Sequence, residues 1–111
     1  MSLSYGCEKF YNAVSTAMVS DLSVQKRLAD VYTNGLNRLG KADVPLNVWD
    51  RLHELTRALT SAVVNEGAVN ATTSAMSERD ARMWLEQIAG MFKDVVEAYG
   101  IEKRDEDMRL R

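Results

Sequence analysis

Apolar residues recur at helical steps of three and four positions from Ser77 to Gly100, which is the spacing of one face of an α-helix. The residues on this face are Ala81, Trp84, Leu85, Ile88, Met91, Phe92, Val95 and Tyr99. Ser77 stands before the first of them as a candidate N-cap, and Gly100 follows the last as a candidate helix end. The pattern predicts one α-helix over 77–100.

Three earlier stretches keep the same helical period. The first predicted helix covers Ser4–Val19 and the second covers Ser23–Leu39, with Gly35 on its buried side. A glycine there removes a side chain and allows a neighbouring helix to approach closely. The third helix is predicted to begin within two residues of Pro45, because proline suits the first turn, and its apolar face reaches Val63.

The segment between the third and fourth predicted helices, from Asn65 to Met76, is small and polar, with no charge after Glu66. A connection of this length is typical of a long loop or of a loop that contains a short helix. Both alternatives are kept, a loop throughout or one short helix around Val69–Met76.

Four amphipathic helices joined by short connections predict an all-α fold, and more specifically a four-helix up-down bundle with mostly antiparallel neighbours. A chain of 111 residues is long enough for one domain and too short for two independent cores. We therefore expect a single helical bundle domain over residues 1–100. Residues 101–111 are rich in charges of both signs, and they are predicted to form a charged, frayed tail.

The composition is that of an average globular protein, with 46% hydrophobic and 27% charged residues. No apolar run approaches the roughly 20 residues that cross a bilayer, and the first residues lack the apolar block of a secretory signal. The lone cysteine, Cys7, agrees with a reducing compartment. These observations predict a cytoplasmic protein without a membrane partner.

The formal net charge is −2, and the Lys and Arg residues are scattered along the chain. Binding to a phosphate backbone draws its affinity from clustered basic side chains, so this pattern argues against a nucleic-acid partner. One nucleic-acid alternative is kept. The first two predicted helices are separated by a short break that suits a helix-turn-helix, so a DNA-associated regulator using these two helices is also considered.

The only histidine, His53, belongs to the one polar cluster with the residue types of a catalytic or metal site. Asp50 precedes it by one helical turn, which brings a carboxylate and an imidazole to one side of a helix, with Glu54 and Arg57 nearby. A small-ligand or metal-dependent enzyme around Asp50, His53 and Glu54 is therefore a second alternative. A metal site needs three or four ligands, however, and the favoured interpretation is a surface histidine packed on Trp49.

The sequence lacks the common motifs of enzymatic chemistry, including nucleotide-binding glycine loops, the nucleophile elbow and the zinc signatures. Cys7 falls on the apolar side of the first predicted helix, which favours a core thiol over a reactive one. We therefore assign no catalytic residue, no cofactor and no metal.

Two features of the fourth predicted helix favour an interaction surface. Its apolar arc is broad, because Trp84, Met91 and Ala98 extend it on one side and Val96 on the other. This width suits either a bundle centre or a bundle plus a dimer interface. Met83 and Gly90 both point to the polar side, where a glycine is unfavourable unless something uses the space. The candidate patch where another helix docks is formed by Met83, Glu86, Gln87, Gly90, Asp94 and Glu97.

The functional hypothesis follows from this patch and from the lack of a catalytic set. The chain is predicted to be a non-enzymatic helical protein-interaction module that self-associates, and a homodimer is the expected oligomer. The DNA-associated regulator and the enzyme around Asp50, His53 and Glu54 are the alternatives from other functional classes.

Overall fold

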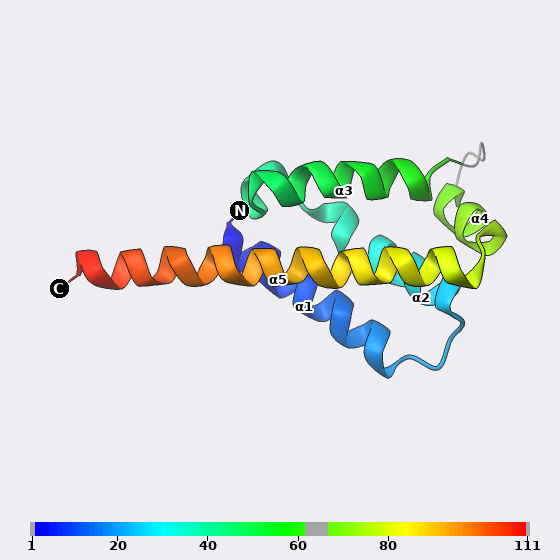
Figure 1. Cartoon of the computed structure of the whole chain (residues 1–111), viewed down its shortest axis with the longest axis horizontal. Helices are drawn as coiled ribbons and strands as arrows, with labels where there is room; N and C mark the ends of the chain where they lie inside the picture. Colours follow the sequence, from blue (N-terminus) through cyan, green and yellow to red (C-terminus); the bar gives the residue numbers. More distant parts are fainter. Residues whose placement is uncertain (1, 62–66, 111) are drawn as a thin grey trace.

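The structure is a computed structural model, and it describes residues 2–61 and 67–110. Within these ranges the chain is all-α, as predicted (Figure 1). Its α-helices are α1 Leu3–Val19, α2 Val24–Thr33, α3 Leu46–Leu59, α4 Ala68–Ala75 and α5 Glu78–Arg109. Two short 3-10 helices, η1 Leu36–Arg38 and η2 Lys41–Asp43, connect α2 to α3.

The predicted four-helix up-down bundle is not confirmed, because the described residues contain the additional helix α4. This helix lies in the segment 65–76 that the sequence leaves open, and the short-helix alternative is correct for the described part of that segment. Asn65 and Glu66 lie outside the described residues. α4 packs against α2 and α3, so it adds to the core as well as joining two helices.

α5 runs the full length of the molecule, and the other helices are arranged around it (Figure 1). α1, α2 and α3 each pack against α5, while α4 lies at the end where α5 begins. Figure 1 also shows α1 crossing α5 at an angle, so that the end of α1 lies away from α5. The molecule is elongated, with overall dimensions of 54 × 27 × 19 Å.

Serine side chains cap the first turns of α1, α2 and α5. The Ser77 hydroxyl accepts a hydrogen bond from the Asp80 backbone N–H at 3.0 Å, which confirms the predicted N-cap of α5. Ser23 caps α2 in the same way. Each hydroxyl satisfies a backbone N–H that has no partner within the first turn of its helix.

α3 begins where the sequence predicts. Its first residue, Leu46, directly follows Pro45, whose fixed φ angle suits the residue before a helix. The helix ends at Leu59. The predicted continuation of its apolar face through Ala62 and Val63 lies outside the described residues.

α2 is shorter than predicted, because it ends at Thr33 and not at Leu39. Asparagine and glycine follow, both with low helix propensity, and Gly35 leaves the helical conformation with φ −163° and ψ −59°. The chain then continues as η1, which brings Leu36 and Leu39 into the core. The prediction that Gly35 is buried beside a neighbouring helix is confirmed, since a Cβ there would lie 3.8 Å from a backbone oxygen of α1.

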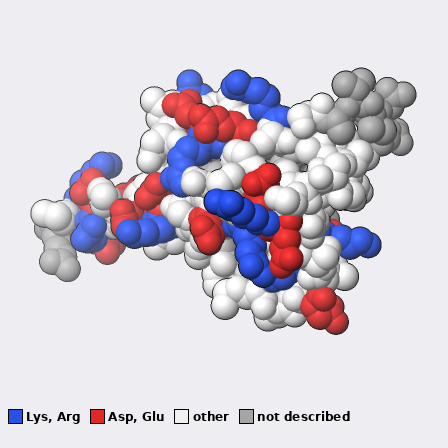
Figure 2. Space-filling model, turned by 45° about the vertical axis from the view of Figure 1, so that its right-hand side comes forward, with Lys and Arg blue, Asp and Glu red and all other residues white. Residues whose placement is uncertain are grey.

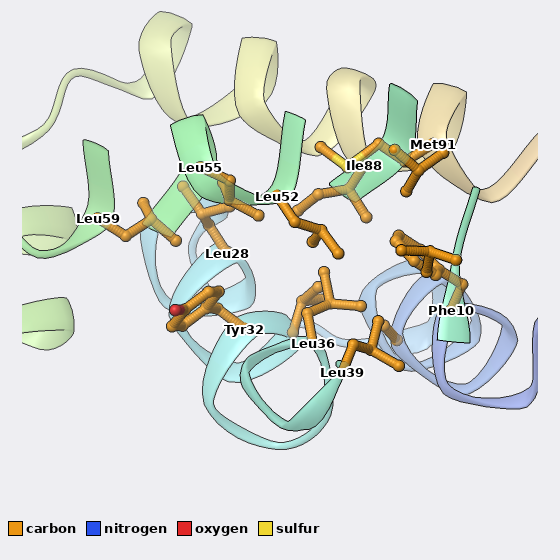
Figure 3. Packing of buried hydrophobic residues seen from close by; sticks show 14 of the residues in the cluster. Phe10, Leu28, Tyr32, Leu36, Leu39, Leu52, Leu55, Leu59, Ile88 and Met91 are labelled. Atoms are coloured by element: carbon orange, nitrogen blue, oxygen red, sulfur yellow. The ribbon is translucent and has the colours of Figure 1, made fainter. Parts of the chain in front are cut away.

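The hydrophobic core forms where the apolar faces of the helices meet. Figure 3 shows these side chains pointing toward one another from α1, α2, η1, α3 and α5. The labelled core residues are Phe10, Leu28, Tyr32, Leu36, Leu39, Leu52, Leu55, Leu59, Ile88 and Met91. The hydroxyl of Tyr32 donates a hydrogen bond to Thr56 Oγ1 at 2.8 Å, which satisfies the one polar group among them.

The predicted helix end at Gly100 is wrong. α5 continues to Arg109, and residues 101–110 form an exposed helical extension in place of the predicted frayed tail. A helix that is already formed continues without a nucleation cost, and one glycine costs only about 1 kcal/mol. Lys103 Nζ lies 4.0 Å from Glu106 Oε2 and 5.8 Å from the centre of the Tyr99 ring, so it pairs with Glu106 along the helix.

Gly6 allows η2 to lie directly against α1, a contact that the sequence pattern does not reveal. A Cβ at Gly6 would overlap the backbone carbonyl oxygen of Asp43. The Asp43 side chain is 1% exposed, and its Oδ2 atom accepts a hydrogen bond from the Gly40 backbone N–H at 2.8 Å. The turn before α3 is therefore fixed by a backbone-to-helix contact that has no room for a side chain.

We expect Gly6→Ala to lower the free energy of unfolding by roughly 2–3 kcal/mol, because either α1 or η2 has to shift to admit the methyl group. Urea unfolding followed by circular dichroism measures this change. Gly100→Ala is the matched control, since Gly100 is also helical but an added Cβ there meets nothing within 4 Å. The control is expected to be neutral or stabilising by at most about 1 kcal/mol. Equal effects of the two substitutions would contradict the Gly6 contact.

Candidate functional site

The middle of the predicted interaction patch on α5 is occupied by a side chain of the same chain. Arg51 extends from α3, and its Nη1 atom donates a hydrogen bond to Asp94 Oδ2 at 2.9 Å. Its Nη2 atom lies 3.3 Å from both the backbone oxygen and the Oε1 atom of Gln87. A Cβ at Gly90 would lie 3.1 Å from the same Nη2 atom. The space left by Gly90 is therefore used by Arg51.

The remaining residues of the predicted patch are on the polar side of α5. Met83 is 49% exposed, and Glu86 and Glu97 are also exposed. Met83 and Glu86 line a shallow, open depression beside the ion pair between Glu78 and Arg82, whose atoms lie 2.8 Å apart. The patch therefore has two parts. Gln87, Gly90 and Asp94 contact Arg51 of α3, whereas Met83, Glu86 and Glu97 are exposed.

A second surface of α5, on the side of α1, is apolar and only partly covered. Tyr11 of α1 packs on Phe92, with ring centroids 6.4 Å apart, and is itself 60% exposed. Val96 is 42% exposed and Ala89 is also exposed. Met18, farther along α1, is 79% exposed. We call Tyr11, Met18, Ala89, Phe92 and Val96 the α1–α5 apolar surface.

An apolar groove opens at one end of this surface, where α1 leaves α5. It has a volume of about 230 Å³ and mainly aliphatic walls, with one basic side chain. Its lining residues are Val14, Ala17, Met18, Arg27, Val31, Leu85, Ile88 and Ala89. We call it the α1–α5 groove. The sequence does not predict this groove, because the angle between α1 and α5 cannot be read from either helix alone. Val96, which widens the apolar arc of α5, is the one signal for the side on which the groove lies.

The polar cluster of α3 is a set of exposed side chains. Asp50, His53, Glu54 and Arg57 are all exposed. The His53 ring lies 4.8 Å from the Trp49 ring at an interplanar angle of 49°, so the predicted packing of the histidine on the tryptophan is confirmed. Over residues 2–61 and 67–110, no group of three or more His, Cys, Asp or Glu side chains is arranged to hold a metal ion.

Cys7 lies at the edge of the core. Its side chain is partly buried and packs against the core cluster, which agrees with the predicted position on the apolar side of the first helix. This position gives Cys7 a packing contact and no neighbouring histidine, because the one histidine of the chain lies on the exposed side of α3.

Charged side chains are intermixed on the face drawn in Figure 2, where basic and acidic groups stand next to one another. A surface that binds a phosphate backbone instead gathers Lys and Arg along one stripe. The face in Figure 2 therefore gives no support to the DNA-associated alternative.

Comparison with models of known protein families, with curated proteins and with solved structures yields no match. In the described part of the chain, no helix is both long enough and apolar enough to cross a membrane. The surfaces of α5 described above are therefore the basis on which a function is proposed.

We expect Arg51 and Asp94 to be energetically coupled across the contact between α3 and α5. Their side chains are 30% and 34% exposed, so the ion pair is partly screened by solvent, and a coupling of roughly 0.5–1 kcal/mol is expected. A double-mutant cycle of Arg51→Ala and Asp94→Ala, measured by urea unfolding, gives this value. The coupling should decrease at high salt. Strict additivity of the two substitutions at low salt would show that the Arg51–Asp94 ion pair contributes nothing in solution.

Proposed function

We propose that this chain is a non-enzymatic helical interaction module that binds a second copy of itself through α5. The observation that carries the proposal is the α1–α5 apolar surface, on which Tyr11, Met18 and Val96 are 60%, 79% and 42% exposed, respectively. Contiguous exposed apolar surface on a small domain is typical of an interaction site. A cytoplasmic location, expected from the lone Cys7, is part of the same proposal.

The spacing of residues along α5 supports a helix as the partner. Leu85, Phe92 and Tyr99 recur every seven residues, and Ala89 and Val96 form a second series with the same interval. Two interleaved series of this kind give a period of about 3.5 residues, which is the pattern of helices that pair along their length. We call these five residues the outer stripe of α5.

The outer stripe is better suited to association than the patch predicted from the sequence. That patch was inferred from the space at Gly90, and Arg51 of the same chain uses this space. Covering Met83 would bring Glu86 and Glu97 out of water, which is costly for unpaired charges. Covering Val96 and Ala89 removes mainly apolar surface from water, which is favourable by about 25 cal/mol per Å².

Neither alternative functional class is proposed. The enzyme hypothesis depends on Asp50, His53 and Glu54 converging, whereas all three are exposed and His53 packs on Trp49. The DNA hypothesis depends on a basic surface, whereas basic and acidic side chains are intermixed on the face in Figure 2. No specific contact described for these residues favours either class over self-association.

We expect the wild-type chain to be a homodimer in sedimentation-velocity experiments at micromolar to millimolar concentrations, and Val96→Glu to be a monomer under the same conditions. The substitution would place a charge in the centre of the buried outer stripe, where it has no partner. Because Val96 is already partly exposed, circular dichroism should show an unchanged fold.

Met83→Glu is the matched control for this experiment. Met83 is on the same helix and is similarly exposed at 49%, but it belongs to the polar side that the sequence patch identifies. The Met83→Glu variant should dimerise like the wild type. A monomeric wild type would refute self-association, and a monomer produced by Met83→Glu but not by Val96→Glu would move the interface to the sequence-predicted patch.

A further inference from the structure

We infer that two copies pair with their α5 helices antiparallel, so that Leu110 of each copy enters the α1–α5 groove of the other. This inference rests on the proposed self-association and assigns its geometry. The occupant of the groove is thus the helical extension, residues 101–110, of a second copy of the same chain.

The extension continues the outer stripe beyond the body of the domain. Lys103 and Leu110 follow Val96 at intervals of seven residues, and Glu106 follows Tyr99 at the same interval. Leu110 is 81% exposed, at the far end of α5 from the groove of its own chain. Most of the Leu110 side chain is therefore available to a second copy.

An antiparallel register brings the apolar members of the two stripes together. In an antiparallel pair, a residue of one seven-residue series lies opposite a residue of the other series. Val96 then lies opposite the partner's Tyr99, and Leu85 lies opposite the partner's Leu110. In the layer between them, the partner's Lys103 faces Phe92, whose ring is already partly covered by Tyr11 of the same copy, so this layer adds little. Leu85 and Ala89 form one wall of the α1–α5 groove, so this register directs the partner's Leu110 into it.

The charges near the groove favour the same arrangement. Among the described residues that line the groove, Arg27 is the charged one, and its Nε atom donates a hydrogen bond to the Leu22 backbone oxygen at 3.0 Å. In the antiparallel register, Glu106 of the partner lies opposite Ala89 and therefore close to Arg27, an attractive pair. A parallel register would instead place Lys103 opposite Lys103 and Glu106 opposite Glu106, which is repulsive.

The length of the contact suits a stable dimer. From Leu85 to Leu110 the stripe extends over about 38 Å of helix at 1.5 Å per residue. A two-fold axis relates the copies, so each contact occurs twice, and neither surface is left for a third copy. The arrangement also gives the extension a role, since without it α5 would not reach the partner's groove.

The inference predicts that Leu110→Asp weakens dimerisation by at least about a hundredfold, because it removes a buried leucine at both ends of the dimer. Ile101→Asp is the matched control. Ile101 is also on the extension and is 51% exposed, but its helical position is on the polar side of α5, away from the outer stripe. The control should dimerise like the wild type in sedimentation velocity.

A charge exchange tests the register. Arg27→Glu and Glu106→Arg should each weaken the homodimer by about tenfold, because each creates two like-charge pairs. An equimolar mixture of the two variants should recover dimers, because both junctions of the mixed dimer again hold opposite charges. The weight-average mass of the mixture should exceed that of either variant alone at the same total concentration.

The outcomes separate this inference from the proposed function. A wild type that stays monomeric at all concentrations refutes both. A dimeric wild type whose mass is unaffected by Leu110→Asp, or whose two charge variants do not recover dimers on mixing, refutes the antiparallel register while leaving self-association in place. Circular dichroism and thermal unfolding confirm that each variant keeps its fold.

Discussion

The burial of one face of a single long helix is the constraint on which the rest of the structure depends. α5 has 32 residues, and its fully buried positions are Ala81, Ile88, Met91 and Val95. The helices α1, α2 and α3 all pack against α5. None of α1, α2 or α3 can bury its own apolar face without α5. The flanks of α5 are consequently the places where the fold and the proposed interface meet.

The two flanks of α5 are covered in different ways. On one flank, α3 places Arg51 over Gly90 and pairs it with Asp94, so a polar surface is closed by hydrogen bonds. On the other flank, α1 crosses at an angle and covers Phe92 but leaves Val96 exposed. Apolar surface that stays in contact with water after folding is unfavourable, and a second helix packed on this flank would remove it from water. Self-association is therefore proposed on the α1 side.

The sequence predicts the helices better than it predicts their ends and their contacts. The period of the apolar residues and the cap at Ser77 are local properties, so they predict the start of α5 correctly. The break at Gly35 depends on whether Leu36 and Leu39 gain more by entering the core than by continuing the helix, and this is decided by tertiary packing.

Glycine illustrates how far sequence reasoning extends at the candidate site. The sequence pattern marks Gly90 as a position where a docking helix would use the space, and in the structure the neighbour there is Arg51 of the same chain, which is distant in sequence. Gly6, which admits the backbone of η2, gave no signal because it lies within an ordinary helical pattern. Gly100 was expected to end a helix, yet its backbone remains helical because the helix is already established before it.

The most direct test of the central claim is isotope-filtered NMR on a mixture of labelled and unlabelled chains at a concentration where the protein is dimeric. Such a spectrum reports only contacts between copies. The account predicts contacts between the Val96 methyl groups of one copy and the Tyr99 ring of the other. Contacts between copies that involve Met83 and Glu97 but not Val96 would contradict it.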